Sequence, residues 1–198
     1  MKQLMIIGTD TDVGKTYVSG LILKKLHENG KKSAYFKAAM SGNIRLSDGS
    51  LLPGDADFVK TTSGISQSLE DMCPYVYETA VSPHLAAKIE GKPIEWETIQ
   101  EAYDTLCGTY DFVTVEGSGG ILCPLRHDET AAFSLADFVI SQHLSCLLVA
   151  DAGLGTLNHV GLTAAYLKSQ NIPLQGIILN RYETGNLLHE DNKRMCEI

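Results

Sequence analysis

The sequence has 198 residues, of which 44% are hydrophobic and 20% charged, values ordinary for one globular domain that buries its core without staples. The formal net charge of −8 disfavours a nucleic-acid-binding protein, because such a protein needs a basic face. No apolar run approaches the roughly 18 residues that cross a bilayer, no cleavable signal precedes the first apolar run, and the five cysteines form no C-x-x-C pair. We therefore expect a soluble, cytoplasmic protein with one domain at 1–198 and no nucleic-acid or membrane partner.

Short apolar runs alternate with helical patterns along the whole chain. Continuous apolar runs bounded by turn residues predict buried parallel strands at 3–8, 33–38, 111–117, 145–151 and 174–180. Helical patterns fall at 15–29, at 83–88 after a capping Ser82, at 95–106 with a stop at Gly108, at 132–142 and at 157–169. This alternation predicts an open α/β sheet with right-handed crossovers, whose ligands bind at the carboxyl ends of the strands.

The segment GTDTDVGKT, residues 8–16, lies between the first expected strand and the first expected helix, as a phosphate-binding loop does. Amide groups at a helix N-terminus attract an anion, Lys15 can reach the β- and γ-phosphates, and the Thr16 hydroxyl can ligate Mg²⁺. Five residues separate the two glycines where the usual pattern has four. Asp10 and Asp12 add negative charge here, which either meets a cationic substrate or Mg²⁺ or belongs to solvated turn residues.

Four further residues are candidates for the chemistry. Glu116 ends a buried strand and precedes glycines, which suits a second carboxylate for Mg²⁺, although it could instead cap a glycine turn. Lys37 lies at the end of an apolar strand, where an unpaired ammonium is costly to bury, and this favours contact with anionic groups over a surface position. Asp55 and Asp57 are either metal or nucleotide contacts or solvated loop residues.

Taken together, seven segments resemble the dethiobiotin synthetases: GTDTDVGKT, FKAAMSG, GDADF, SPHLAA, VEGSGGILCPL, GLGTLNH and ILNR. The five-residue spacing in the loop is the form found in this family. The resemblance implies a P-loop NTPase fold, in which an open parallel sheet carries helices on both faces in three α/β/α layers. Family members continue into a further strand that completes the adenine pocket, whereas this sequence ends at NKRMCEI in an expected helix. Ser118 stands where many relatives have alanine.

The resemblance also implies an activity, an ATP- and Mg²⁺-dependent ring closure in biotin biosynthesis. Carbon dioxide forms a carbamate on one amine of 7,8-diaminononanoate, ATP phosphorylates the carbamate, and the second amine displaces phosphate to close the ureido ring of dethiobiotin. Carbamate activation is the purpose of the ATP, because a carbamate is a poor electrophile until its oxygen leaves as phosphate.

By the same resemblance, Lys15 and Lys37 are catalytic residues that bracket the transferring phosphoryl group and the carbamate. The implied Mg²⁺ ligands are Thr16, Asp55 and Glu116. The implied ATP-binding residues are Asp12, Val13, Gly14, Lys15, Thr16, Tyr17, Asp55, Glu116, Gly117, Ser118, Gly119, Asn180, which reads the adenine edge, and Arg181. The implied substrate contacts are Thr11, Ser41, Gly155, Thr156, Leu157 and Asn158. The last four open a helix that the partner subunit of a homodimer contributes for the substrate carboxylate.

Three other interpretations remain open at this point. A dimeric partitioning or scaffold ATPase of the same superfamily would act as a switch, but such proteins usually carry a lysine four residues before the glycine of G-K-T, and here that position is Asp10. A related amide- or ring-forming ligase would act on a different acid. A third possibility is a protein that binds nucleotide without turnover.

Overall fold

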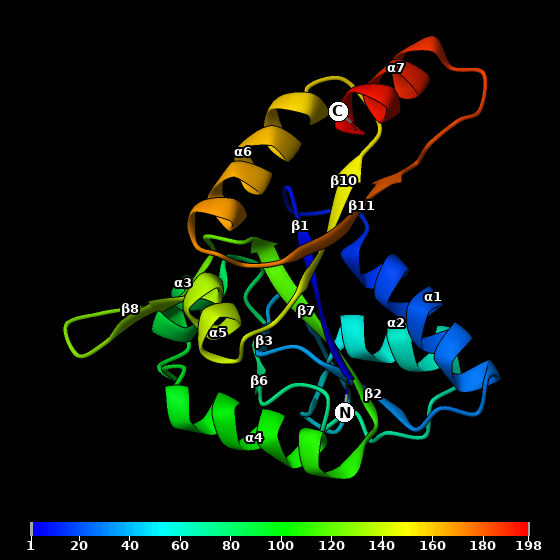
Figure 1. The fold of residues 1–198 in the computed structure, drawn as a ribbon. Helices are drawn as coiled ribbons and strands as arrows, with labels where there is room; N and C mark the ends of the chain where they lie inside the picture. Colours follow the sequence, from blue (N-terminus) through cyan, green and yellow to red (C-terminus); the bar gives the residue numbers. More distant parts are fainter. Residues whose placement is uncertain (1, 198) are drawn as a thin grey trace.

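The computed structural model describes residues 2–197, and five parallel strands form its central sheet (Figure 1). Their order is β11-β10-β1-β7-β2, and every neighbouring pair is parallel. The strands are β1 (Lys2–Gly8), β2 (Ser33–Phe36), β7 (Phe112–Gly120), β10 (Cys146–Asp151) and β11 (Leu174–Asn180). All five expected strands are present, and the predicted open parallel sheet is confirmed.

Helices cover both faces of this sheet. They are α1 (Lys15–Glu28), α2 (Gly54–Ser63), α3 (Pro83–Ile89), α4 (Trp96–Thr109), α5 (Leu135–Ser141), α6 (Thr156–Ser169) and α7 (Leu187–Cys196). Alternate residues of β1 point to opposite faces. Met5 packs in the cluster that contains Phe138 of α5, whereas Ile6 packs with Val18 of α1. The three-layer α/β/α architecture is therefore as expected.

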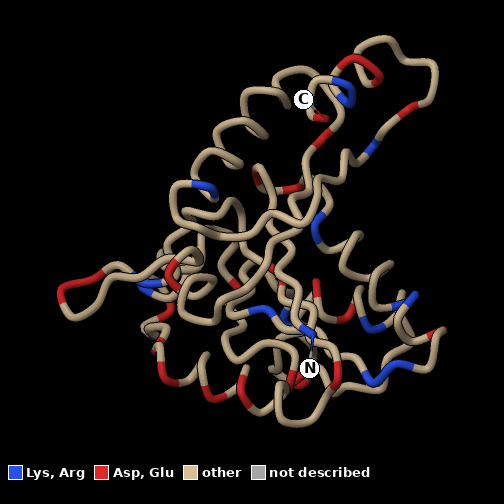
Figure 2. The backbone as a smooth tube through the Cα atoms, viewed as in Figure 1, with Lys and Arg blue, Asp and Glu red and all other residues tan. Residues whose placement is uncertain are grey.

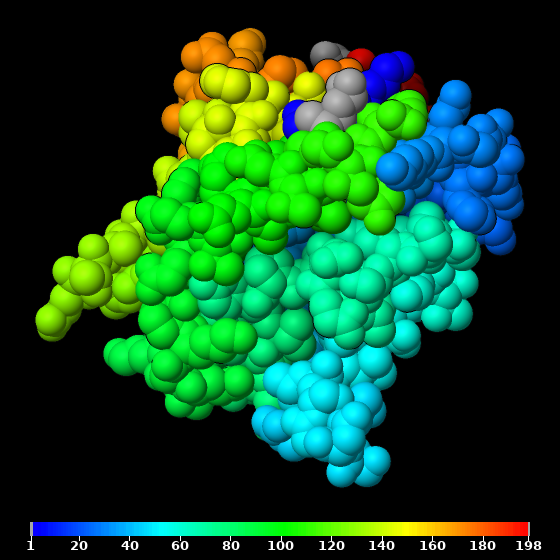
Figure 3. All heavy atoms as spheres, turned by 90° about the horizontal axis from the view of Figure 1, so that it is seen from below, coloured from blue at the N-terminus to red at the C-terminus, as the bar shows by residue number. Residues whose placement is uncertain are grey.

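Short strand pairs outside the main sheet were not foreseen. β3 (Ala39–Met40) pairs with β6 (Tyr75–Val76), β4 (Ile44–Arg45) with β5 (Leu51–Leu52), and β8 (Pro124–His127) with β9 (Ala132–Ser134). The β4–β5 and β8–β9 hairpins project from the body of the molecule in the space-filling view (Figure 3). Pairs of two to four residues leave little periodicity in a sequence, which explains why they were missed.

Three helices differ from the sequence-based predictions. The helix expected at 132–142 begins at Leu135, because Ser134 and Asp137 form a capping box and the preceding residues pair in β9. The helix expected to stop at Gly108 runs on to Thr109, since Gly108 does not take the positive φ that ends a helix at glycine. Residues 54–63, interpreted as a loop, form α2. Ser82 is the N-cap residue of α3, but its side chain makes no capping hydrogen bond.

Figure 2 shows Lys and Arg on several elements of the chain rather than gathered along one, whereas the charged residues of α4 are all acidic. All five cysteines are free. Within residues 2–197, none of the helices combines the length and the apolar character that crossing a membrane requires.

Candidate functional site

A cavity of about 870 Å³ lies at the carboxyl end of the sheet, where the loops after β1, β2 and β7 meet the first turn of α2. The predicted residues that line it are Thr11, Asp12, Gly14, Lys15, Thr16, Lys37, Ser41, Asp55, Glu116, Ser118, Gly119 and Arg181. Another cavity, of about 580 Å³, lies against β11 and α7 and contains none of the predicted residues. The fold thus brings most of the predicted residues into one place.

The phosphate-binding loop is shaped by two glycines that no other residue could replace without a shift. A Cβ on Gly14 would lie 2.0 Å from Nδ2 of Asn180, and Gly14 has φ 98° at the N-cap of α1. A Cβ on Gly8 would lie 2.7 Å from the carbonyl oxygen of Asp10. Lys15 opens α1, is buried, and donates from Nζ to that same carbonyl at 2.7 Å. The loop therefore wraps closely around the Lys15 side chain, as the predicted phosphate site requires.

The second group of site residues centres on Glu116, which projects from β7 and is buried. Its Oε1 accepts a hydrogen bond from the Thr16 hydroxyl at 2.7 Å, and its Oε2 accepts one from the Ser19 hydroxyl at 2.8 Å. The Thr16 hydroxyl also lies 3.3 Å from Oδ1 of Asp55. The three predicted metal ligands therefore meet at one point, although they lie far apart in the chain.

Lys37 joins these carboxylates from just beyond the end of β2. Its Nζ lies 2.6 Å from Oδ2 of Asp55 and 2.9 Å from Oε1 of Glu116. This lysine is thus buried and paired with two carboxylates of the protein, and its role toward substrate anions stays a prediction. Asp57, the alternative to Asp55, does not line the cavity.

Electrostatics inside this group favour the charged forms of Lys37 and Asp55 but not that of Lys15. Burial opposes the charged form of Lys37, but attraction to Glu116 and Asp55 outweighs it and raises the pKa of the ammonium. Burial likewise opposes ionisation of Asp55, yet Lys37 outweighs it and lowers the pKa of this carboxyl. For Lys15, burial and the like charge of Lys37 lower the pKa below its ordinary value. Two lysines so close together are suited to an anion that carries more than one charge.

The donor set fits Mg²⁺ in its chemistry. Mg²⁺ takes oxygen ligands, is usually held by one or two carboxylates plus substrate phosphates, and keeps several waters. Asp55 and Glu116 offer two carboxylates and Thr16 a hydroxyl. In the part of the chain that the structure describes, no three His, Cys, Asp or Glu side chains form a metal site by themselves. Beside these three protein oxygens, the further ligands of an ion here would be nucleotide oxygens or water.

Two residues at the carboxyl end of β11 hold residues 12 and 13 of the phosphate loop. The Asn180 amide donates to the carbonyl of Val13 at 2.9 Å, and Arg181 donates to the carbonyl of Asp12 at 2.7 Å. Arg181 also forms an ion pair with Asp151 at 2.7 Å. Asp12 and Arg181 both have positive φ, 58° and 56°, which is uncommon outside glycine. These bonds therefore stabilise a strained loop conformation from a strand that is distant in sequence.

Some predicted residues lie outside the cavity, and some of its residues were not predicted. Val13, Tyr17, Gly117, Asn180 and the segment 155–158 do not line it. The hydroxyls of Ser41 and Ser118 face it but donate to the carbonyls of Val81 and Ala39. The residues that were missed are Met40, Ala80, Val81, Ser82, Pro83 and Cys123. Four of these lie inside the segments FKAAMSG, SPHLAA and VEGSGGILCPL, namely Met40, Ser82, Pro83 and Cys123. The resemblance of these segments to the family could therefore have identified them as site residues.

Two solved structures show a similar fold. A ParA family ATPase from Chlorobium tepidum TLS superposes with a TM-score of 0.54 at 16% identity, covering 99% of this chain and 81% of that one. A putative plasmid partition protein from Borrelia burgdorferi B31 gives 0.54 at 14% identity, covering 98% and 81%. At these identities the likeness concerns the fold alone.

Sequence comparison identifies the family. The model of an AAA domain matches residues 2–197. The chain is 47% identical to the ATP-dependent dethiobiotin synthetase BioD of Clostridium novyi (strain NT), over 98% of this chain and 81% of that relative. It is 44% identical to the protein of the same name from Brachyspira hyodysenteriae, over 99% and 86%. With the predicted loop, lysines and carboxylates gathered in one cavity, this chain belongs to the ATP-dependent dethiobiotin synthetase family of biotin biosynthesis.

Proposed function

We propose that this chain closes the ureido ring of dethiobiotin from 7,8-diaminononanoate and CO₂ with ATP as co-substrate. One observation carries the proposal: in a chain 47% identical to a dethiobiotin synthetase, Lys15, Lys37 and Glu116 lie together beside the phosphate loop. A site for phosphoryl transfer to a weakly nucleophilic anion needs this combination of cations and metal-binding oxygens.

The chemistry has three bond-forming steps. A neutral amine of the substrate attacks the carbon of CO₂ and loses a proton, which gives a carbamate. A carbamate oxygen attacks the γ-phosphorus of ATP, the bond to the β–γ bridging oxygen breaks, and ADP leaves. The second amine attacks the carbamate carbon, the C–O bond to the phosphoryl group breaks, and phosphate leaves as the ring closes. The second amine loses its proton in this last step, so one ATP is converted to ADP and phosphate for each ring.

The two lysines act on the anions of this sequence. Lys15 opens α1 within the phosphate loop, so its ammonium would lie against the β- and γ-phosphates. Lys37 contacts Oε1 of Glu116 and would lie against the carbamate and the transferring phosphoryl group. Both side chains are buried, so their charges act with little screening by water. Before the substrate arrives, the Asp10 carbonyl holds the Lys15 ammonium, and Asp55 and Glu116 hold that of Lys37, so both charges are already inside the site.

Mg²⁺ belongs to this proposal as the cofactor. Thr16, Asp55 and Glu116 would hold it, and when bound it neutralises charge on the β- and γ-phosphates. Of the two candidate aspartates, we assign the role to Asp55, because its carboxylate shares the Thr16 hydroxyl with Glu116.

The remaining roles follow the family and the position of each residue. Thr11, Ser41, Gly119 and Arg181 all line the cavity; the first two would contact the substrate and the last two the nucleotide. Asn180 donates to Val13, which leaves its amide oxygen to accept a hydrogen bond from the amino group of adenine.

We further propose a homodimer that shares each site between two subunits. The segment 155–158 opens α6 outside the cavity of its own chain, so its amide groups could bind the substrate carboxylate only in a partner's site. Just before this helix, Leu154 is 92% exposed, and Leu157 and Leu162 on α6 are also exposed. Exposed leucines near a functional segment are consistent with a subunit contact.

One experiment tests the proposal directly. The chain is incubated with 7,8-diaminononanoate, bicarbonate, ATP and MgCl₂, and the products are analysed by mass spectrometry. Dethiobiotin and ADP should form in equal amounts, and neither should form at a comparable rate when the diamine is omitted. A folded sample that gives no dethiobiotin would contradict the proposal, and rapid ATP hydrolysis without the diamine would favour the switch ATPase.

A further inference from the structure

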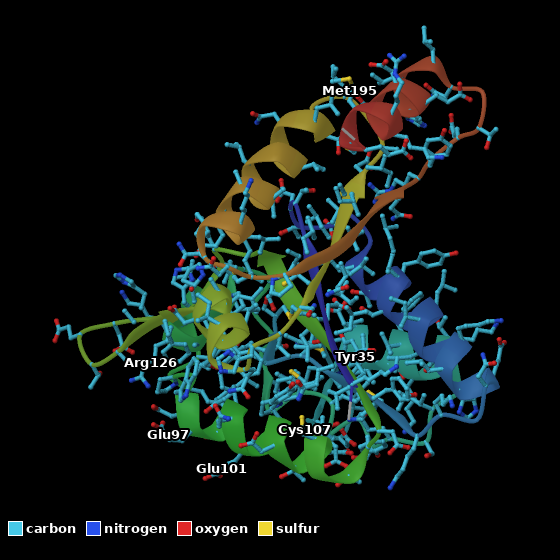
Figure 4. All side chains as sticks on the ribbon, in the orientation of Figure 1. Tyr35, Glu97, Glu101, Cys107, Arg126 and Met195 are labelled. Atoms are coloured by element: carbon cyan, nitrogen blue, oxygen red, sulfur yellow. The ribbon has the colours of Figure 1, made fainter. Side chains whose placement is uncertain are left out.

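One buried hydroxyl beside the site has no role in the function proposed above. Tyr35 lies in β2, two residues before Lys37, and has no exposed surface. Figure 4 labels it in the interior of the molecule. Within the described residues 2–197, its hydroxyl has no hydrogen-bond partner. An unpaired buried hydroxyl destabilises a protein, so its presence here calls for an explanation.

The sheet register puts Tyr35 on the same face as Glu116. β2 pairs with β7 so that Tyr35 is opposite Thr114. Glu116 follows two residues later, and side chains two apart in a strand share a face, so Tyr35 and Glu116 occupy diagonal positions that a long side chain can bridge. Burial raises the pKa of the Tyr35 hydroxyl well above its ordinary value, and the charges of Glu116 and Asp55 raise it further. A phenol has one O–H to donate and an ionised carboxylate can only accept, so Tyr35 is the donor in any hydrogen bond to these carboxylates.

The backbone of Tyr35 is held in place from outside the sheet. β2 is at one edge of the sheet, where its backbone groups have no neighbouring strand. The buried side-chain amide of Gln67 takes that place, since its Oε1 accepts from the Tyr35 N–H at 2.8 Å and its Nε2 donates to the Tyr35 carbonyl at 2.9 Å. The phenol is therefore anchored to a fixed strand rather than to a mobile edge.

Glu116 would lose hydrogen-bond donors when the substrate and Mg²⁺ bind. Its carboxylate accepts hydrogen bonds from Thr16, Lys37 and Ser19. In the proposed function, Thr16 turns to Mg²⁺ and Lys37 to the substrate, so only Ser19 would remain. We propose that Tyr35 is a positioning residue, which donates a hydrogen bond to Glu116 once Lys37 engages the substrate. The bond holds the carboxylate in the orientation that a divalent cation needs. This inference rests on the proposed function for the tasks of Lys37 and Thr16.

The test compares Tyr35→Phe with a matched control, Tyr103→Phe. Tyr103 in α4 is also buried, and its hydroxyl also has no partner within the described residues, but it belongs to the core on the other face of the sheet. Each substitution removes one unpaired hydroxyl and keeps the ring, so neither variant should melt below the wild type. The affinity for Mn²⁺, the probe ion, is measured by electron paramagnetic resonance with ADP and phosphate present, so that phosphate supplies the anion for Lys37, and kcat is measured for dethiobiotin formation.

For Tyr35→Phe we expect Mn²⁺ affinity with ADP and phosphate to fall about tenfold, as for the loss of one hydrogen bond to a charged group, and kcat to fall by a similar factor. Tyr103→Phe should match the wild type in both. Equal Mn²⁺ affinity in the two variants, or a loss of melting temperature in Tyr35→Phe without a change in Mn²⁺ affinity, would overturn the inference. If the wild type made no dethiobiotin, the proposed function would fail, whereas the Mn²⁺ titration would still decide the role of Tyr35. A wild type with no Mn²⁺ site would overturn both the cation site and this role.

Discussion

Replacing Lys37 with methionine removes the ammonium that lies between two carboxylates of the site, 2.6 Å from Asp55 and 2.9 Å from Glu116. Methionine has a similar length and no charge, so packing changes little. Breaking a buried ion pair by removing one partner costs about 3–5 kcal/mol. The lower end applies here, because the Asp55 side chain is 40% exposed and Glu116 keeps hydrogen bonds from Thr16 and Ser19.

The loss of stability and the loss of activity should be of different sizes. A destabilisation of about 3 kcal/mol lowers the melting temperature of a domain of this size by roughly 6–12 °C and leaves a protein of ordinary stability folded at 25 °C. The rate should fall much more, by about 10²–10³-fold, since one preorganised group at the reacting centre contributes that much. ATP binding depends on the loop around Lys15, so the Kd for ATP should change by no more than about threefold.

Three measurements on Lys37→Met check this reasoning. They are the melting temperature, the Kd for ATP by calorimetry, and the rate of dethiobiotin formation by mass spectrometry. Lys37→Arg, which keeps a positive charge, should melt closer to the wild type. A Lys37→Met variant that keeps more than a tenth of the wild-type rate would refute the role of the ammonium, and an unchanged melting temperature would refute the argument about the buried pair.

Four further outcomes are expected. Burial opposes ionisation of Asp55, but Lys37 outweighs it and lowers the pKa of this carboxyl. The stability from this pair is therefore present above about pH 4 and is lost as the pH falls through the lowered pKa. In urea unfolding, the free energy of unfolding should fall less between pH 7 and pH 3 in Asp55→Asn than in the wild type. Asp55→Asn should weaken Mn²⁺ binding with ADP about tenfold, whereas Asp57→Asn should leave it unchanged, and equal effects would contradict the choice of Asp55. Arg181→Ala should raise the Kd for ATP about three- to tenfold in calorimetry, because the phosphate loop loses a charged donor; an unchanged Kd would show that the loop holds its shape without it. Mixing Lys37→Met subunits with Leu157→Pro subunits, which lack one amide N–H in the first turn of α6, should restore about a quarter of wild-type activity, since half of random dimers carry one intact shared site; proven heterodimers without activity would exclude sharing.

The sequence by itself determined the sheet and the phosphate loop. Strands covered on both faces are continuous apolar runs, so their positions can be predicted from local composition, and 174–180 was predicted to the residue. The loop was equally local, because the strand, the glycines and Lys15 lie within sixteen residues of one another. Local patterns gave a wrong prediction where tertiary contacts determine the structure. Residues 132–134 were expected to start a helix, but they pair in a hairpin.

Only the tertiary structure decided how the distant parts of the site meet. Asp55 and Asp57 are indistinguishable in sequence, but α2 separates their directions by about 200°, so that only Asp55 faces Thr16 and Glu116. The contact of Arg181 with the phosphate loop spans 169 residues, and no spacing rule reaches so far. The same holds for the unpaired hydroxyl of Tyr35, which the pairing of β2 with β7 brings beside Glu116. The sequence itself shows the chemical type of each residue and the spacing between neighbours in the chain. Whether distant side chains meet depends on the order of the strands and on which way each helix turns its residues, and the packing of the whole domain sets both.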